Sequence, residues 1–357
     1  MKKISYIPFS KKKINHFFDY RNILLYSKLK GVKIEEYDKN KNFDIIVLPP
    51  SYDPTDLTIF KSKKIKIVYH LVDNYLAVST FSLKNIFRGL FFFLTGNSKK
   101  ITFNYKKSQM NLCKLSHAVI CASLDQKNII KKINKNCYIF FEGNFHVSKA
   151  EVIKTKKITP FKIVWEGRSE NLSHLMFFVN AFKILAKKYR IELHIITDLS
   201  YPLFNNFINL SSIKKIKKIF GNYYHENIVQ KRSHIYIHQW NLSFVSTILK
   251  SCDLAIIPLN QQKKFISGKS MNKLIHMWRN NLPTICSDIG SYRNIAQITN
   301  LDICCNNTNE WVKKIERIIN DEKYKNTYIK ISSKFIAENY STKHFILQWD
   351  KMFDSLN

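Results

Sequence analysis

The sequence predicts an α/β fold in which two successive domains each contain a parallel β-sheet covered by helices. Short apolar runs of about four to eight residues alternate with longer amphipathic stretches, a pattern typical of buried parallel strands joined by helices. The pattern stops in a Lys-rich stretch at 148–160 and then begins again. The length of 357 residues corresponds to about two domains of roughly 150 residues each.

In the first half of the chain, apolar runs predict strands at 4–7, 43–48, 65–69, 118–123 and 137–141. The stretch Tyr20–Lys30 predicts a helix, because its periodicity ends at Gly31, a residue that commonly follows the last helical turn. A second helix is expected at about 125–133, directly after the strand at 118–123.

In the second half, strands are expected at 161–165, 191–197, 234–237, 253–257 and 282–287. Apolar residues at helical spacing between 172 and 185 predict a helix. Further helical stretches are expected at 242–250, 273–279, 311–319 and about 328–355. We therefore predict domains at 1–155 and 156–335, followed by a C-terminal helix at 336–357.

Composition restricts the class of protein and its partners. The apolar share of 45% excludes a disordered or collagen-like chain. The chain carries 58 Lys and Arg against 26 Asp and Glu, a formal net charge of +32 that leans toward the first half. Such a field favours a membrane surface, nucleic acid or phosphorylated substrates. AT-rich coding, which enriches Lys, Asn and Ile, is an alternative source of the same excess.

The lack of a visible targeting signal and the pattern of cysteines predict a cytoplasmic protein. No apolar core of signal-peptide length follows Met1-Lys2-Lys3, and the densest apolar run, 90–94, is far shorter than the ~18–20 residues that span a bilayer. Seven cysteines without a C-x-x-C pair favour reduced, buried thiols. Aromatic residues and lysines over 86–107 predict a segment that binds an anionic membrane surface, with a buried, basic-flanked helix as the alternative.

Ligands of open parallel sheets bind where the strands end, so the residues that follow the predicted strands form the candidate site. In the second half these are Gly167-Arg168, Trp240, Pro258 and the stretch S-G-K-S-M-N-K-L at 267–274, which leads into a helix. Helix N–H groups, lysines and a guanidinium all bind phosphate. Trp240 would stack on a nucleobase, with core packing as the alternative. A P-loop is excluded, because its first glycine would fall on Lys263.

Four ordered motifs make residues 161–296 resemble the nucleotide-sugar-binding domain of GT-B glycosyltransferases, particularly the group 1 or family 4 enzymes of bacterial surface polysaccharides. They are K-I-V-W-E-G-R at 162–168, S-C-D-L-A-I-I-P-L at 251–259, N-K-L-I-H-M at 272–277 and N-L-P-T-I at 281–285. The resemblance implies two Rossmann-like domains facing across a cleft. Strand ends and resemblance together predict a donor site of Gly167, Arg168, Trp240, Pro258, Lys269, Ser270, Asn272, Lys273 and His276.

The first half resembles the acceptor domain of the same family. The run K-I-V-Y-H at 66–70 is similar to a strand whose last histidine faces the donor sugar, which predicts a catalytic or sugar-contacting His70 unless this histidine is structural. Asp73 is the predicted general base, with a turn aspartate as the alternative. The resemblance also implies that the C-terminal helix crosses back to this domain.

Three positions depart from the family pattern. His276 stands where many relatives carry the glutamate that binds the nucleotide ribose. Gly268 replaces an earlier glutamate, and His174 replaces a lysine that pairs with the Gly-Arg arginine on diphosphate. Ribose recognition therefore differs here, and we expect the phosphate cation to be Lys269 or Lys273. A weakened site, a CMP-activated sugar and an inactive relative all remain open at this point.

These observations predict a metal-independent glycosyltransferase that uses no cofactor besides its nucleotide-sugar donor. We expect its acceptor to be a surface glycan, in particular a lipid-linked one, and its location to be the cytoplasm, at the inner face of the membrane. Nucleic acid is not expected as a partner. The alternatives are a nucleotide-sugar epimerase of the same fold and a non-catalytic relative that binds membrane or RNA through its charge.

Overall fold

The computed structural model describes residues 2–10, 17–62, 64–72, 75–77, 83–143, 160–203, 208–221 and 233–356. They belong to two compact units. Unit 1 contains 1–143, 263–271 and 340–357, and unit 2 contains 144–262 and 272–339. The predicted boundary at 155/156 lies outside the described residues and stays a prediction.

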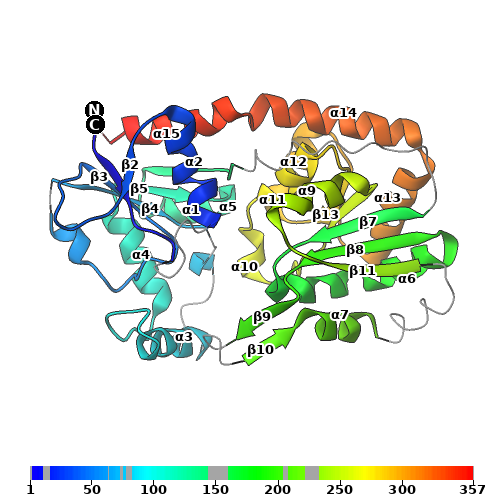
Figure 1. The fold of residues 1–357 in the computed structure, drawn as a ribbon, viewed down its shortest axis with the longest axis horizontal. Helices are drawn as coiled ribbons and strands as arrows, with labels where there is room; N and C mark the ends of the chain where they lie inside the picture. Colours follow the sequence, from blue (N-terminus) through cyan, green and yellow to red (C-terminus); the bar gives the residue numbers. More distant parts are fainter. Residues whose placement is uncertain are drawn as a thin grey trace. The chain divides into compact units, whose positions relative to one another are not determined.

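Unit 1 is built on a parallel sheet of six strands in the order β2-β1-β3-β4-β5-β6 (Figure 1). The strands are β1 (Ile4–Tyr6), β2 (Ile34–Glu36), β3 (Ile45–Leu48), β4 (Lys66–His70), β5 (Ala118–Cys121) and β6 (Cys137–Ile139). All except β2 lie within the predicted runs, apart from His70 at the end of β4, which lies one residue beyond its run. Strands β3 and β5 are buried at every residue, because both faces of the sheet are covered.

The helices of unit 1 follow the predicted pattern in part. Their bounds are α1 (Phe17–Arg21), α2 (Ile23–Lys30), α3 (Leu83–Leu94), α4 (Tyr105–Leu115), α5 (Leu124–Ile130), α10 (Lys264–Ser267) and α15 (Thr342–Asp354), with short 3₁₀ turns η1 (Thr58–Lys61) and η2 (Tyr75–Ala77). Helix α2 ends at Gly31, whose φ of 69° is left-handed, as the sequence predicted. The stretch predicted as one helix is divided between α1 and α2 at Asn22, which is not helical.

Helix α15 packs on α2 of unit 1. The Tyr26 hydroxyl donates to an Asp350 carboxylate oxygen at 2.8 Å, and Lys30 pairs with the same carboxylate at 2.7 Å. The Tyr26 ring stacks on Trp349 with the ring centroids 5.6 Å apart. These contacts join the end of the chain to its first helices, more than 300 residues away in sequence.

Unit 2 is built on a second parallel sheet of six strands, in the order β11-β8-β7-β12-β13-β14 (Figure 1). The strands are β7 (Phe161–Glu166), β8 (Ile191–Thr197), β11 (Ser233–Gln239), β12 (Leu254–Ile257), β13 (Thr284–Ser287) and β14 (Cys304–Cys305). The predicted strands of this half are confirmed. An antiparallel hairpin, β9 (Ser200–Leu203) with β10 (Ile208–Ser211), was not predicted.

The helices of unit 2 are α6 (Val179–Lys188), α7 (Ser212–Phe220), α9 (Leu242–Ser251), α11 (Asn272–Arg279), α12 (Gly290–Thr299), α13 (Thr308–Asn320) and α14 (Glu322–Asn339). A 3₁₀ segment, η4 (Ser169–Phe177), precedes α6. The prediction of one helix over 172–185 was therefore wrong, because the stretch changes from 3₁₀ to α geometry at Phe178. One core cluster joins sheet and helices through Val164, Ile196, Val245, Leu249, Cys252, Ala255, Met277 and Leu282.

Tyr328 joins α14 to the sheet of unit 2 through three buried hydrogen bonds. Its hydroxyl donates to the Thr284 carbonyl at 2.7 Å and accepts from the Thr284 N–H at 3.1 Å and the Trp278 Nε1–H at 3.0 Å. The Tyr328 side chain is fully buried. Each buried polar group left without a partner costs about 1–3 kcal/mol.

We therefore expect Tyr328→Phe to lower the free energy of unfolding of unit 2 by at least about 2 kcal/mol, because two N–H donors and a carbonyl lose their partner. Urea unfolding followed by tryptophan fluorescence measures this effect. Tyr324→Phe is the matched control on the same helix. An unchanged unfolding midpoint in Tyr328→Phe would contradict the prediction.

Candidate functional site

The chain order of the strands in unit 2 reverses between β7 and β12. From β7 the chain proceeds outward to β8 and β11, and then returns to the other side of β7 to form β12, β13 and β14. Strands β7 and β12 are hydrogen-bonded neighbours. Loops diverge where the order reverses, so the ligand site of such a sheet lies beyond the ends of these two strands. The residues after Glu166 and Ile257 are therefore the candidate site.

Gly167 follows β7 in a position that excludes a side chain. A Cβ atom there would lie 2.8 Å from two ring carbons of Trp165 and 2.9 Å from the Lys273 Nζ. The Lys273 Nζ donates to the Glu166 carbonyl at 2.6 Å and lies 5.3 Å from the centroid of the Trp165 ring. The absence of a side chain at Gly167 thus makes room for the ammonium of Lys273, which α11 places beside the loop after β7.

Arg168 is the next residue, and its side chain is 77% exposed. Its guanidinium pairs with the Glu170 carboxylate at 2.8 Å. Ser169 begins η4 and donates its hydroxyl to the Asp198 carbonyl at 3.2 Å, which ties this loop to the end of β8. The exposed guanidinium is therefore carried on a loop that is fixed on both sides.

The loop after β12 is held by two side chains. The Ser287 hydroxyl accepts from the Leu259 N–H at 2.8 Å and lies 3.2 Å from the Leu259 carbonyl. The Asn260 N–H donates to the His174 Nδ1 at 3.2 Å, and His174 is buried. Pro258 is buried as well. His174 therefore positions the β12 loop, and Pro258 packs inside the unit.

Helix α11 carries three predicted donor residues: Asn272, Lys273 and His276. All three are half-buried. The opposite face of α11 is buried through Leu274, Ile275, Met277 and Trp278. Trp240, at the end of β11, donates its N–H to the Thr197 carbonyl at 2.9 Å and packs against the core cluster of unit 2.

Lys269 and Ser270 belong to unit 1, although the sequence prediction placed them in the second domain. The Ser123 hydroxyl donates to the Gly268 carbonyl at 3.0 Å and fixes this segment. The predicted donor residues are therefore divided: Gly167, Arg168 and Lys273 are brought together in unit 2, whereas Lys269 and Ser270 are placed with unit 1.

His70 is the last residue of β4, and its imidazole packs between aromatic rings of α1 and α15. The ring centroids lie 4.9 Å from Phe18 and 6.3 Å from Trp349, and 6% of the residue is exposed. Burial lowers the pKa of His70 to about 3, so the imidazole is neutral. Its role at the sugar stays a prediction. Asp73, the predicted base, lies outside the described residues.

Asp19 is a buried carboxyl that the sequence reasoning missed. Its Oδ2 accepts from the Phe9 N–H at 2.9 Å, and the Ser51 hydroxyl donates to the Phe9 carbonyl at 2.6 Å. Phe9 follows β1 and Ser51 follows β3, the two strands at which the order of sheet 1 reverses. The sequence could have drawn attention to this residue, because Asp19 is the sole acidic residue among the first 34.

Burial, with a smaller contribution from Glu36, raises the pKa of Asp19 to about 6. Between about pH 4 and pH 6 the unfolded chain loses this proton while the folded chain keeps it, so the free energy of unfolding falls as pH rises. Asp19→Asn keeps the acceptor oxygen without the charge. We expect the variant to be more stable than the wild type at pH 7.5 by about 1–3 kcal/mol and equal to it near pH 3.5. Denaturant unfolding at both pH values tests this, and a less stable variant at pH 7.5 would contradict it.

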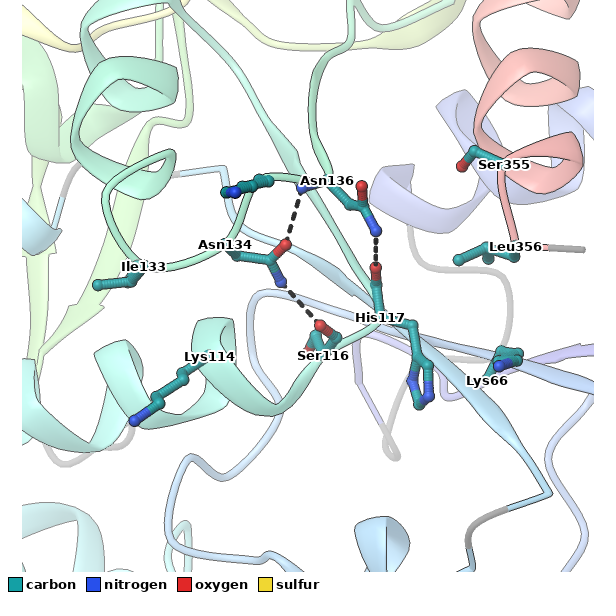
Figure 2. A pocket seen from close by; sticks show the side chains of 10 residues that line it. Lys66, Lys114, Ser116, His117, Ile133, Asn134, Asn136, Ser355 and Leu356 are labelled. Carbon is teal, nitrogen blue, oxygen red and sulfur yellow. Dashed lines mark hydrogen bonds between the residues drawn. The ribbon is translucent and has the colours of Figure 1, made fainter.

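A cavity of about 380 Å³ lies at the opposite, amino edge of the unit 1 sheet (Figure 2). Lys66 begins β4, while His117 and Asn136 directly precede β5 and β6. Figure 2 shows Lys114 directed away from His117. Lys114 lies in the last turn of α4, where a lysine is favoured by the helix dipole without any ligand. This cavity is therefore not the candidate donor site.

A smaller cavity of about 220 Å³ lies in unit 2 beyond β12, β13 and β14. Its walls include Phe177, Leu259, Gln261 and Trp311. The Gln261 Nε2 donates to the Cys305 carbonyl at 2.9 Å and so joins the β12 and β14 loops. Among the described residues, no cluster of three or more His, Cys, Asp or Glu could hold a metal ion.

Solved structures share this fold over almost the whole chain. A glycosyltransferase from Rickettsia africae has a TM-score of 0.56 and 13% identity, over 97% of this chain and 83% of its own. WaaG, a glycosyltransferase involved in lipopolysaccharide biosynthesis, has a TM-score of 0.54 and 9% identity, over 98% of this chain and 97% of its own. The fold is GT-B. The predicted fold class is confirmed by two parallel six-stranded sheets and these neighbours.

This GT-B chain is also similar to TarM from S. aureus, with a TM-score of 0.54 and 13% identity over 87% of the chain. It spans about half of the TarM chain, 55% of its length. No protein-family model matches the GT-B chain, and no curated protein matches it at the level of sequence. The likeness therefore lies in the three-dimensional structure, at identities of 15% and below.

Proposed function

We propose that this GT-B chain is a glycosyltransferase that moves a sugar from a nucleotide-sugar donor to a surface glycan. The observation that carries the proposal is the loop after β7, where Gly167 leaves room for Lys273 beside the exposed Arg168. The loop lies where the chain order of the sheet reverses, between β7 and β12. Structures of the same fold support a nucleotide donor. They are TarM in complex with UDP, and an E. coli structure bound with UDP-2-fluoro glucose.

The charge on this loop suits the proposed chemistry. When a nucleoside diphosphate departs, negative charge grows on its phosphates while the anomeric carbon becomes cationic. Arg168 and Lys273 would neutralise the departing phosphates, and such interactions count most when they strengthen in the transition state. In this proposal the leaving group is stabilised by protein cations, and the nucleotide sugar is the sole cofactor-like molecule that the reaction needs.

The remaining predicted residues take supporting roles in the proposal. Asn272 and His276 lie on the half-buried side of α11, one turn apart, so they would contact the ribose. Trp240 follows β11 at the same edge of the sheet and would contact the base. His70 and Asp73 remain the proposed acceptor-side residues of unit 1, with His70 enclosed by Phe18 and Trp349.

A second part of the proposal concerns the membrane. Helix α3 and the loop after it carry seven exposed large apolar side chains: Phe87, Leu90, Phe91, Phe93, Leu94, Ile101 and Phe103. Gly89 is buried against the Thr102 carbonyl, and Phe92 packs edge-on against Tyr105 with the ring centroids 5.4 Å apart. These contacts fix the helix to the loop that carries the other exposed side chains. We call these seven residues the α3 surface.

Lysines near the α3 surface in sequence support an anionic membrane as its partner. Lys99, Lys100 and Lys107 are exposed close to it in sequence. Apolar side chains flanked by lysines bind the interface of an anionic bilayer, because both apolar burial and charge attraction contribute. Among the described residues, no helix is long and apolar enough to cross a bilayer. The exposed apolar side chains and the nearby lysines support peripheral attachment, which would bring the enzyme to a lipid-linked acceptor.

A thermal-shift panel of UDP, GDP, CMP, dTDP and ADP tests the donor proposal. A ligand present at 100 times its Kd adds about 2.7 kcal/mol of stability and should raise the melting temperature by a few degrees. One nucleotide that shifts the melting temperature would support the proposal and identify the donor class. The absence of a shift with every nucleotide would favour a non-catalytic relative that binds membrane or RNA.

A further inference from the structure

We propose that Lys215 is a phosphate-binding residue of the donor site, an inference that rests on the proposed function. Lys215 lies in the first half of α7, far in sequence from the loop after β7. Its Nζ donates to the Ser169 carbonyl at 3.1 Å and lies 3.5 Å from the Glu170 carbonyl. These are the two residues that follow Arg168, so α7 delivers a second lysine to the same loop.

The position of α7 is fixed by the end of β8. The Ser212 N–H donates to the Leu199 carbonyl at 2.9 Å, and the Ser212 hydroxyl donates to the Asp198 carbonyl. The Ser169 hydroxyl donates to the same Asp198 carbonyl at 3.2 Å. The first turns of α7 and η4 therefore start side by side, and the partial positive charge at a helix start adds to the lysine.

Lysines thus lie on both sides of the loop. On the β12 side, Lys273 contacts the Glu166 carbonyl, and on the β8 side, Lys215 contacts the Ser169 carbonyl. Arg168 lies between these two contacts in sequence. Its guanidinium is paired with Glu170, whose side chain is 48% exposed, and an exposed pair of this kind is weak. Phosphate forms stronger, charge-assisted hydrogen bonds with an ammonium than a main-chain carbonyl does.

The other lysines of α7 provide a contrast. Lys214, Lys217 and Lys218 are exposed, whereas Lys215 is half-buried against η4. If the charge of α7 served solubility alone, all four of its lysines would be expected to be exposed to solvent. The amphipathic pattern alone does not distinguish Lys215 from Lys218, since both lie on the polar part of the sequence S-I-K-K-I-K-K-I-F.

Titration calorimetry on the full chain tests the assignment with UDP, GDP, dTDP and ADP and the corresponding monophosphates as probes. Lys215→Met is the test variant, Lys215→Arg the conservative one, and Lys218→Met the matched control on the same helix. For the diphosphate that binds the wild type, we expect Lys215→Met to weaken binding at least tenfold. We also expect Lys215→Met to reduce the preference for diphosphate over monophosphate. Lys215→Arg should retain most of this preference, and Lys218→Met should change neither the diphosphate affinity nor the preference.

Each alternative result overturns the assignment in a distinguishable way. Unchanged diphosphate affinity in Lys215→Met would leave the donor site in place and remove Lys215 from it. If Lys215→Met lost affinity for monophosphate and diphosphate equally, and its melting temperature fell, Lys215 would merely hold the loop in place. A wild type that binds none of the diphosphates would overturn the assignment of Lys215. If CMP also gave no thermal shift, the proposed function would be overturned as well.

Discussion

Replacing Lys273 with methionine is expected to weaken binding of the donor nucleotide strongly while the fold is retained. Methionine fills the space of the aliphatic stem, so the change removes the ammonium together with its hydrogen bond to the Glu166 carbonyl and its contact with the Trp165 ring. A charge-assisted hydrogen bond contributes about 1.5–3 kcal/mol, which corresponds to a roughly 10- to 150-fold rise in Kd. Calorimetry with the nucleotide that gives the thermal shift measures this change.

The effect of Lys273→Met is expected to be large because the ammonium is already in place. It is held at 2.6 Å from the Glu166 carbonyl, beside the position that Gly167 leaves open. Lys313, which is exposed on α13, gives the matched control Lys313→Met. An unchanged Kd in Lys273→Met, with circular dichroism equal to that of the wild type, would remove the loop after β7 from the donor site.

Two substitutions on the α3 surface are expected to release the protein from membranes. Phe87 and Leu94 are 66% and 72% exposed on α3. Burial of each apolar side chain contributes about 1.5–3 kcal/mol, so Phe87→Glu with Leu94→Glu should weaken binding at least about 100-fold. Co-sedimentation with vesicles that contain phosphatidylglycerol measures the loss. The wild type should bind vesicles of pure phosphatidylcholine less well, because each nearby lysine contributes about 1 kcal/mol on an anionic surface.

The matched control is Ile298→Glu, since Ile298 is 62% exposed on α12 of unit 2. This variant should bind vesicles as the wild type does. The double variant should still give the thermal shift with the donor nucleotide, because α3 belongs to unit 1 and the proposed donor loop to unit 2. Equal sedimentation of the double variant and the wild type would exclude the α3 surface as the membrane contact.

Much of the fold followed from local patterns. Buried strands such as β3, β5 and β12 appear as unbroken apolar runs because both of their faces are covered, and the end of α2 was marked by Gly31. The Gly-Arg turn was equally visible, because a glycine and an arginine directly follow a buried strand. Periodicity was less informative where geometry changes, as at Phe178 between η4 and α6.

The break between α14 and α15 illustrates a second limit. The sequence predicted helical structure from about 328 to 355, and the structure has it, but the chain leaves the helix at Tyr340–Ser341. Ser341 caps α15 by accepting from the His344 N–H at 3.4 Å. The helical periodicity on both sides hides such a break. Trp349 on α15 then meets Tyr26, a contact that no local pattern specifies.

The sequence by itself determined the two α/β units, most of their strands and the glycine and arginine of the candidate loop. These features depend on neighbours in the chain, which the periodicity and the strand ends display. The tertiary structure decided which charges meet at that loop. Lys273 reaches the Glu166 carbonyl across 107 positions, and Lys215 reaches the Ser169 carbonyl across 46. Such meetings depend on strand order and helix placement, which side-chain chemistry along the chain does not encode locally.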